Sequence, residues 1–408
     1  MNSDPVTAMK RLRIALVLAG MVAVAAFGLR DRMQRRPFAG RGLGYISSSQ
    51  RIEGAFFRSQ GFTASPTGRK PEEVTVVDFN GDGFLDVAVC SSYQRVEPPG
   101  GEVSVYLGVG GGRLGKETRI VVGELTEGIA TAHFDDDRFL DLATADYGGG
   151  TLSILRGSSQ GPVQRIQTLR LGSAGPRDVV AHDVDRDGRT DLVFCAMDAD
   201  QVGVARGQGD GTFVLSGDRV VVGQGPEVLA LGRFNEDAAE DLVTANRHDN
   251  SVTVLHGDGA GGFRVAQQLP AGQFPRYVLV TDLDGDGFDD FLSASYKDAR
   301  VTPFRNLRGG GFQALEPLTV AGLEGAIYVA LGDVNGDGLV DLAASLHRSG
   351  YVVIFAGRGG FSFAEPQLVP IGVSCLGVAV ADLSGDGSMD LVVGNPLANR
   401  LQVYIQER

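Results

Sequence analysis

Short runs of apolar and β-branched residues recur along the chain, and clusters of Gly, Asp and Asn separate them. In residues 177–222 the runs read RDVVAHDV, TDLVFCAM, QVGVARGQ and FVLSGDRVVV. Each run has the composition and the bounding turn residues of a β-strand, and no helical period intervenes. The pattern therefore predicts units of four antiparallel strands joined by hairpins.

An acidic nine-residue loop follows the first strand of each unit. The seven copies read DFNGDGFLD at 78, HFDDDRFLD at 133, DVDRDGRTD at 183, RFNEDAAED at 233, DLDGDGFDD at 282, DVNGDGLVD at 333 and DLSGDGSMD at 382. Their final aspartates are 49 to 55 residues apart. Four strands in about fifty residues make one propeller blade, so the sequence predicts an all-β, seven-bladed β-propeller of four-stranded antiparallel blades.

The ends of the repeat array predict how the ring closes. The last repeat ends after LQVYIQ, at its third strand, and a strand-like piece, AFFRSQGFTA, precedes the first repeat. We expect this N-terminal piece to pair with the C-terminal strand as the outer strand of the last blade. Pro303 lies in the third strand of the fifth repeat, where it removes a backbone donor and predicts a local bulge.

The N-terminal residues predict export. An apolar run from Ile14 to Leu29 follows a basic cluster, which is the arrangement of a secretory signal. The run is short for a membrane span, which needs about 20 residues, but an uncleaved anchor at residues 14–29 remains the alternative. We divide the chain into a signal peptide or N-terminal membrane anchor at 1–36, a linker at 37–49 and the propeller at 50–408. The predicted location is secreted or periplasmic, with or without that anchor.

Charge narrows the range of partners. The chain has a formal net charge of −13, and its first 36 residues carry +5, which leaves −18 on the remainder. Such a surface repels nucleic acid and anionic lipid. Cations, cationic proteins and neutral glycans remain as partners.

Five of the acidic loops have the chemistry of Ca²⁺ sites. Oxygen-bearing side chains alternate at positions 1, 3 and 5, glycine at position 6 permits a positive φ, and the carbonyl of position 7 completes the turn. Position 12 is not Glu, so we expect the aspartate at position 9 to be the bidentate ligand. Hard oxygen ligands favour Ca²⁺ over Zn²⁺ or copper. The predicted ligands are Asp78, Asn80, Asp82, Phe84 and Asp86; Asp183, Asp185, Asp187, Arg189 and Asp191; Asp282, Asp284, Asp286, Phe288 and Asp290; Asp333, Asn335, Asp337, Leu339 and Asp341; and Asp382, Ser384, Asp386, Ser388 and Asp390.

The second loop departs from this pattern. It has His133 at position 1 and Arg138 in place of glycine, which leaves Asp135, Asp137 and Asp141 as a weakened set. Whether this set binds metal stays open.

The fourth loop departs further, with Arg233 at position 1 and Ala238 at position 6. We expect the Arg233 guanidinium to take the cation position and to pair with Asp237 or Asp241. Metal binding by Asn235, Asp237 and Asp241 also stays open.

These repeats resemble FG-GAP, or VCBS, repeats, the units of the integrin α-subunit propeller. The resemblance extends over residues 50–408 and includes glycine turns such as GDGTF at 209 and GGGF at 309. It implies Ca²⁺ loops on one face of the ring and partner-binding loops on the opposite face. The implied ligand face comprises Tyr147, Asp198, Asp200, Arg247, His248, Asp249, Tyr296, Lys297, His347, Arg348, Asn395 and Asn399. The implied channel mouth comprises Glu72, Glu127, Arg177, Glu227, Arg276 and Tyr328.

The favoured function is a binding or adhesion module for an unidentified protein or glycan, and not an enzyme. A Ca²⁺-dependent propeller enzyme, of the polysaccharide lyase or phosphatase type, is one alternative, and a structural spacer is another. The five histidines form no motif with a nucleophile, and the sequence has no phosphate-binding loop. Strongly perturbed ionisable residues at the channel mouth would favour the enzyme. A featureless loop face would favour the spacer.

Overall fold

The computed structural model describes residues 57–64, 70–92, 100–320, 323 and 325–406. The predicted signal or anchor at 1–36 and the linker at 37–49 lie outside the described residues. In the part of the chain that the structure describes, no helix has both the length and the hydropathy to span a membrane.

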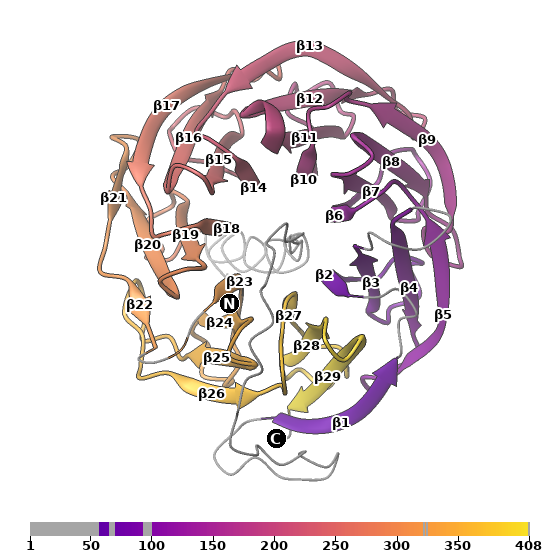
Figure 1. Ribbon diagram of the computed structural model, residues 1–408, viewed down its shortest axis with the longest axis vertical. Coiled ribbons are helices and arrows are strands. Elements are labelled where there is room, and N and C mark those ends of the chain that lie inside the picture. Colours follow the sequence, from indigo (N-terminus) through magenta and orange to yellow (C-terminus); the bar gives the residue numbers. More distant parts are fainter. Residues whose placement is uncertain (1–56, 65–69, 93–99, 321–322, 324, 407–408) are drawn as a thin grey trace, which may run out of the picture.

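The described strands form seven antiparallel sheets arranged as blades around a central axis (Figure 1). Blade 1 contains β2 (Pro71–Val77), β3 (Asp86–Ser91), β4 (Glu102–Gly108) and β5 (Leu114–Val121); blade 2 contains β6 (Thr126–Ala132), β7 (Asp141–Asp146), β8 (Thr151–Arg156) and β9 (Gln164–Arg170). Blade 3 contains β10 (Pro176–His182), β11 (Asp191–Ala196), β12 (Gln201–Gly207) and β13 (Phe213–Val221); blade 4 contains β14 (Pro226–Gly232), β15 (Asp241–Asn246), β16 (Ser251–Gly257) and β17 (Phe263–Pro270). The predicted seven-bladed all-β fold is confirmed.

The remaining three blades follow the same plan. Blade 5 contains β18 (Pro275–Thr281), β19 (Asp290–Ser295), β20 (Arg300–Asn306), β21 (Phe312–Ala314) and β22 (Leu318–Thr319). Blade 6 contains β23 (Ala326–Gly332), β24 (Asp341–Leu346), β25 (Tyr351–Phe355) and β26 (Gln367–Pro370). Blade 7 contains β27 (Val378–Ala381), β28 (Asp390–Asn395), β29 (Arg400–Gln406) and β1 (Phe57–Ala64). The one short helix, η1 (Met197–Ala199), connects β11 to β12 in the described chain.

Ring closure occurs as the sequence predicts. β1 is the outer strand of blade 7 and pairs antiparallel with β29, with Phe57 opposite Gln406 and Gln60 opposite Val403. The first and last described strands therefore share one sheet.

The second strand of every blade is buried along its whole length, because it packs against neighbouring blades on both faces. This burial accounts for its continuous apolar sequence. Cys90 and Cys195 lie in two of these strands and are 0% exposed. By contrast, the outer strand β17 contains only half-buried and exposed residues. The core therefore lies between the blades.

Pro303 does not produce a bulge in its own strand. β20 pairs with β19 in an uninterrupted register that places Pro303 opposite Leu292. The interruption falls in the outer strand, which is split into β21 and β22 at the two ends of β20. Because Pro303 has no amide hydrogen, no carbonyl of the outer strand can accept a hydrogen bond from it. The bulge prediction was wrong in location.

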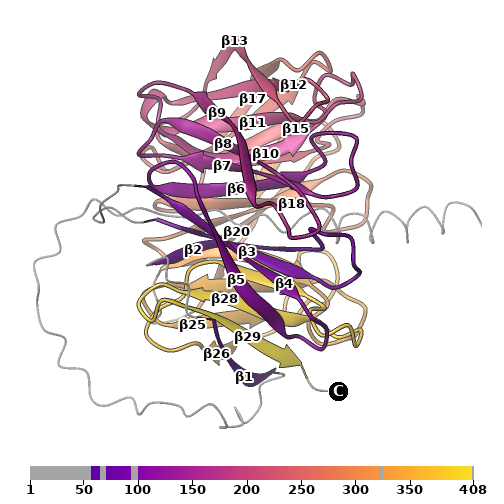
Figure 2. The ribbon, with the colours of Figure 1, turned by 90° about the vertical axis from the view of Figure 1, so that its right-hand side faces the viewer.

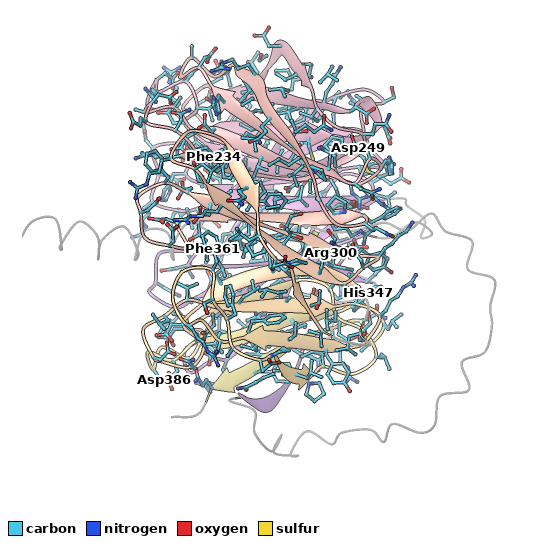
Figure 3. All side chains as sticks on the ribbon, turned by 90° about the vertical axis from the view of Figure 1, so that its left-hand side faces the viewer. Phe234, Asp249, Arg300, His347, Phe361 and Asp386 are labelled. Carbon is cyan, nitrogen blue, oxygen red and sulfur yellow. The ribbon has the colours of Figure 1, made fainter. Side chains whose placement is uncertain are left out.

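The loops gather on the two faces of the ring, as the side view in Figure 2 shows. Asp386, in the loop between β27 and β28, lies on one face, and Asp249 and His347 lie on the other (Figure 3). The antiparallel order puts every first-to-second loop on the face of Asp386 and every second-to-third loop on the face of Asp249. We call these the acidic face and the ligand face.

Candidate metal centre and ligand face

The five intact acidic loops share one turn conformation. In blade 1, the amides of Gly81 and Gly83 each donate to the Asp78 carboxylate at 2.8 Å. Positions 4 and 6 of all five loops have positive φ. These residues are Gly81 and Gly83, Arg186 and Gly188, Gly285 and Gly287, Gly336 and Gly338, and Gly385 and Gly387. The turn is therefore wrapped around the carboxylate at position 1.

The two degenerate loops do not adopt this turn. Asp136 and Arg138 in blade 2, and Glu236 and Ala238 in blade 4, have no positive φ. Position 6 accounts for the difference, because it is Gly in all five intact loops and Arg138 or Ala238 in the degenerate loops, and side chains with a Cβ disfavour a positive φ.

The prediction for Arg233 was wrong in its partner. Its Nε lies 3.4 Å from Glu240 Oε1, and Asp241 Oδ2 instead accepts from Asn235 Nδ2 at 3.1 Å. The Arg233 side chain is 54% exposed. Asp241 already accepts the amides of Phe234 and Gly257, so the guanidinium pairs at the rim of the loop.

The aspartate at position 9 has a role that sequence reasoning missed. In blade 1, Asp86 Oδ2 accepts the amide of Phe79 at 2.9 Å, and Oδ1 accepts the amide of Gly108 at 2.6 Å. The same carboxylate accepts an amide from the end of the third strand in every blade; the donors are Gly108, Gly157, Gly207, Gly257, Asn306, Gly357 and Gln406. We call this aspartate the clamp. The sequence signal for this role was the presence of Asp at position 9 in both degenerate loops.

Burial affects the clamp carboxylates electrostatically. Desolvation raises the pKa of Asp86 to about 6 and that of Asp290 to about 7, although backbone amides lower both. A cation in the loop would offset this desolvation, because it stabilises the charged form.

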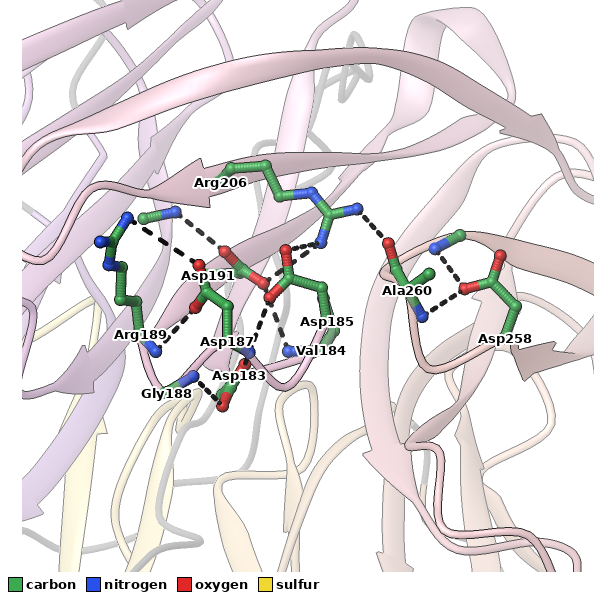
Figure 4. A network of polar contacts seen from close by, with 12 residues as sticks. Asp183, Val184, Asp185, Asp187, Gly188, Arg189, Asp191, Arg206, Asp258 and Ala260 are labelled. Atoms are coloured by element: carbon green, nitrogen blue, oxygen red, sulfur yellow. Dashed lines mark hydrogen bonds and ion pairs between the residues drawn. The ribbon is translucent and has the colours of Figure 1, made fainter.

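Three carboxylates converge in two of the loops. Within the described residues, oxygens within 4.8 Å of one another come from Asp183, Asp185 and Asp191 in blade 3, and from Asp282, Asp284 and Asp290 in blade 5. Figure 4 shows the blade 3 cluster together with Arg206. In blades 1, 6 and 7, position 3 is Asn80, Asn335 or Ser384, so fewer carboxylates are present.

The donor chemistry fits a hard divalent cation. The side chains at positions 1, 3, 5 and 9 offer oxygen alone, which suits Ca²⁺. Asp284 Oδ1 is a buried oxygen without a hydrogen-bond partner in the described chain, so it retains capacity for a metal.

Most residues of the implied ligand face lie at the surface. Tyr296 and Asn395 are exceptions, because they are 7% and 2% exposed. Over blades 4 to 6, cations lie on aromatic rings: Lys297 Nζ is 3.8 Å from the Phe274 ring centre, and Arg348 Cζ is 5.2 Å from that of Tyr296. Arg247 covers the Phe274 ring as well, at 4.8 Å. The ligand face therefore has a concentrated cation-aromatic cluster, which a featureless spacer would lack.

The residues implied for the channel mouth are buried at the starts of the inner strands. Glu72, Glu127, Arg177, Glu227, Arg276 and Tyr328 are each 2% exposed or less. Arg177 pairs with Glu127 and lies 2.7 Å from Glu227, and Arg276 lies 3.9 Å from Glu227. Desolvation raises the pKa of Glu127 to about 8, although Arg177 lowers it. These charges form an ionic belt and not an exposed ring.

Comparison with protein families identifies the repeats of this seven-bladed propeller. A model described as an FG-GAP-like repeat matches residues 133–194, 233–293, 282–344 and 333–393, and one described as an FG-GAP repeat matches residues 71–106. Because these matches cover more than half of the chain, the protein belongs to the FG-GAP repeat family. No curated protein matches the sequence.

Solved structures share the fold at low identity. BBS1N, in a complex with ARL6DN, is 14% identical, with a TM-score of 0.59, and the match covers 87% of this chain and 98% of BBS1N. A catalytically inactive virginiamycin B lyase from Staphylococcus aureus, with quinupristin, is 12% identical, with a TM-score of 0.58 and coverage of 86% and 100%. A periplasmic gluconolactonase from Pseudomonas aeruginosa is 18% identical, with a TM-score of 0.52 and coverage of 72% and 87%. These likenesses show the fold alone.

Proposed function

We propose that this protein is an exported, Ca²⁺-stabilised binding module that recognises a protein or glycan through its ligand face. The observation that carries the proposal is the separation of two chemistries: oxygen-rich loops on one face, and a cation-aromatic cluster on the other. Metal bound on the acidic face would stabilise the blades, and the ligand face would remain accessible to a partner.

Calcium would act as part of the fold. Extracellular Ca²⁺ modules bind at about 10⁻⁴ to 10⁻³ M, and free ion at ten times that constant stabilises each site by about 1.4 kcal/mol. Five such sites would contribute about 7 kcal/mol, which rivals the ~5 to 15 kcal/mol stability of a typical domain.

Recognition would use the cation-aromatic cluster. Lys297 and Arg348 are exposed, and they offer N–H donors to the hydroxyls and carboxylates of a glycan or peptide. Their charged ends already lie over the rings of Phe274 and Tyr296, so little side-chain entropy is lost on binding.

A glycan array, with a secreted-protein array beside it, tests this proposal. We expect ligands that bind the wild type and are lost with Lys297→Ala. Lys116→Ala is the matched control, because Lys116 is exposed on the outer strand β5. Equal binding by the two variants would contradict recognition through this cluster.

The ionic belt favours a second candidate, a propeller enzyme. Glu127 has the raised pKa of a proton donor or acceptor that works near neutral pH, and Arg177 lies beside it. Hydrolysis of lactones and phosphate esters and β-elimination of uronate polysaccharides would be assayed with wild type and Glu127→Gln. Turnover that disappears in the variant would support the enzyme, and a folded wild type without turnover would count against it.

A further inference from the structure

One position at the end of the third strand differs in charge between blades. It immediately precedes the amide that the clamp aspartate accepts, so it has the same place in each blade. Its occupants, from blade 1 to blade 7, are Leu107, Arg156, Arg206, His256, Arg305, Ala356 and Ile405. Three blades therefore have a permanent cation beside the acidic loop, and blades 1, 6 and 7 have an apolar residue there.

Each of the three arginines pairs with the carboxylate at loop position 3. Arg206 Nη1 lies 2.7 Å from Asp185 Oδ2 and 3.5 Å from Asp191 Oδ2 (Figure 4). Arg305 Nη2 lies 2.8 Å from Asp284 Oδ2. Arg156 Nε lies 3.1 Å from Asp135 Oδ2 in the degenerate loop of blade 2.

The arginine and the carboxylate at position 3 occur together. Position 3 is Asp in blades 2, 3 and 5, where the third strand supplies Arg, and it is Asn or Ser in the other four blades. At positions 1, 3, 5 and 9 the intact loops of blades 3 and 5 thus have four aspartates, with a third-strand arginine on position 3, whereas those of blades 1, 6 and 7 have three aspartates. The extra carboxylate is matched by an internal cation.

We propose that Arg206 and Arg305 are built-in cations that compete with Ca²⁺ for position 3, so that the propeller has two classes of Ca²⁺ site. This inference rests on the proposed Ca²⁺ function. In blades 3 and 5 the ion must displace the guanidinium from an ion pair and bind next to that positive charge, which lowers its affinity. Asp284 Oδ1 keeps no hydrogen-bond partner in the described structure, so the blade 5 site is weakened and not abolished.

If these arginines served only to join neighbouring blades, replacement of Arg206 and replacement of Arg156 would have the same effect. Arg206 Nη2 also donates to the carbonyl of Ala260 at 2.6 Å, which ties blade 3 to blade 4. Arg156 Nη2 makes the equivalent bond to Asp210 at 2.8 Å, between blades 2 and 3. Arg156 is therefore a matched control, because its loop lacks the position 1 carboxylate and the position 6 glycine.

Calcium titration of the chelator-treated protein by isothermal calorimetry tests the proposal. We expect the wild type to show three tight sites and two that are about tenfold or more weaker, since ligand charge tunes affinity over this range. The double variant Arg206→Gln/Arg305→Gln should show five tight sites. Arg156→Gln should give the wild-type isotherm, although it loses the same inter-blade bond.

A reciprocal variant covers the case in which the double variant fails to fold. Asn335→Asp with Ala356→Arg transfers the pair to blade 6 and should move one site from the tight to the weak class. Five equal wild-type sites, or arginine variants with the wild-type isotherm, would overturn this inference alone. Absence of Ca²⁺ binding in every protein would overturn the proposed Ca²⁺ function and this inference with it.

Discussion

The contribution of the clamp to stability can be measured apart from that of metal binding if the clamp aspartate is replaced in a blade without an intact metal loop. Asp141 in blade 2 is 1% exposed, and its two oxygens accept the amides of Phe134 at 2.7 Å and Gly157 at 2.6 Å. Asp141→Ala leaves two buried N–H groups without a partner, and each costs about 1 to 3 kcal/mol. The expected loss is therefore about 2 to 6 kcal/mol.

Thermal unfolding by circular dichroism measures this loss. A propeller of about 350 residues has an unfolding entropy of about 0.7 kcal/mol/K, so the Tm should fall by about 3 to 8 °C. The fall should be the same in chelator and in calcium, because the clamp acts without metal. Asp137→Ala is the control: Asp137 is exposed in the same loop, and its loss should cost at most about 0.5 kcal/mol. A Tm of Asp141→Ala within about 1 °C of the wild type, or a fall seen in calcium alone, would refute the clamp.

Three further predictions concern other parts of the molecule. Burial lowers the pKa of His347 to about 4, so the stability that neutral His347 contributes is present above pH 6.5 and is lost as pH falls toward 4. Urea unfolding should therefore show the wild type losing about 1 to 2 kcal/mol relative to His347→Gln between pH 7 and pH 5, and a constant difference would count against this. Deletion of residues 57–64 exposes the edge of β29, so light scattering should detect dimers or aggregates; a monomer with the wild-type melt would disprove strand closure. Cys90, Cys195 and Cys375 are buried and their pKa values are raised, so a thiol reagent should label none of them before unfolding, and rapid labelling of the native protein would be inconsistent with the packing.

The fold was predictable because the repeat carries it. The position of β1 followed from the missing fourth strand of the last repeat, and the pairing of Phe57 with Gln406 confirms it. The intact and degenerate loops were also separable by sequence, because glycine at position 6 determines whether the turn can form.

Side-chain partners were less predictable than backbone structure. Arg233 pairs with Glu240, because clamp amides already occupy Asp241, and that competition depends on three-dimensional contacts. The effect of Pro303 also depends on three-dimensional contacts, because the interruption falls in the outer strand that pairs with β20 and not in β20 itself. The arginine pairs left a trace in the sequence, namely Asp at position 3 in the three blades with a third-strand Arg. Loop and strand had to be compared blade by blade to reveal it.

The central claim is that Ca²⁺ in the acidic loops holds the ring of blades together. The melting temperature of the purified protein, with Ca²⁺ at about ten times the dissociation constant of the weakest site and then with excess chelator, tests it most directly. Five sites at about 1.4 kcal/mol or more each predict a fall of at least about 10 °C in chelator, restored by added Ca²⁺. Superimposable melts in the two conditions would contradict the claim.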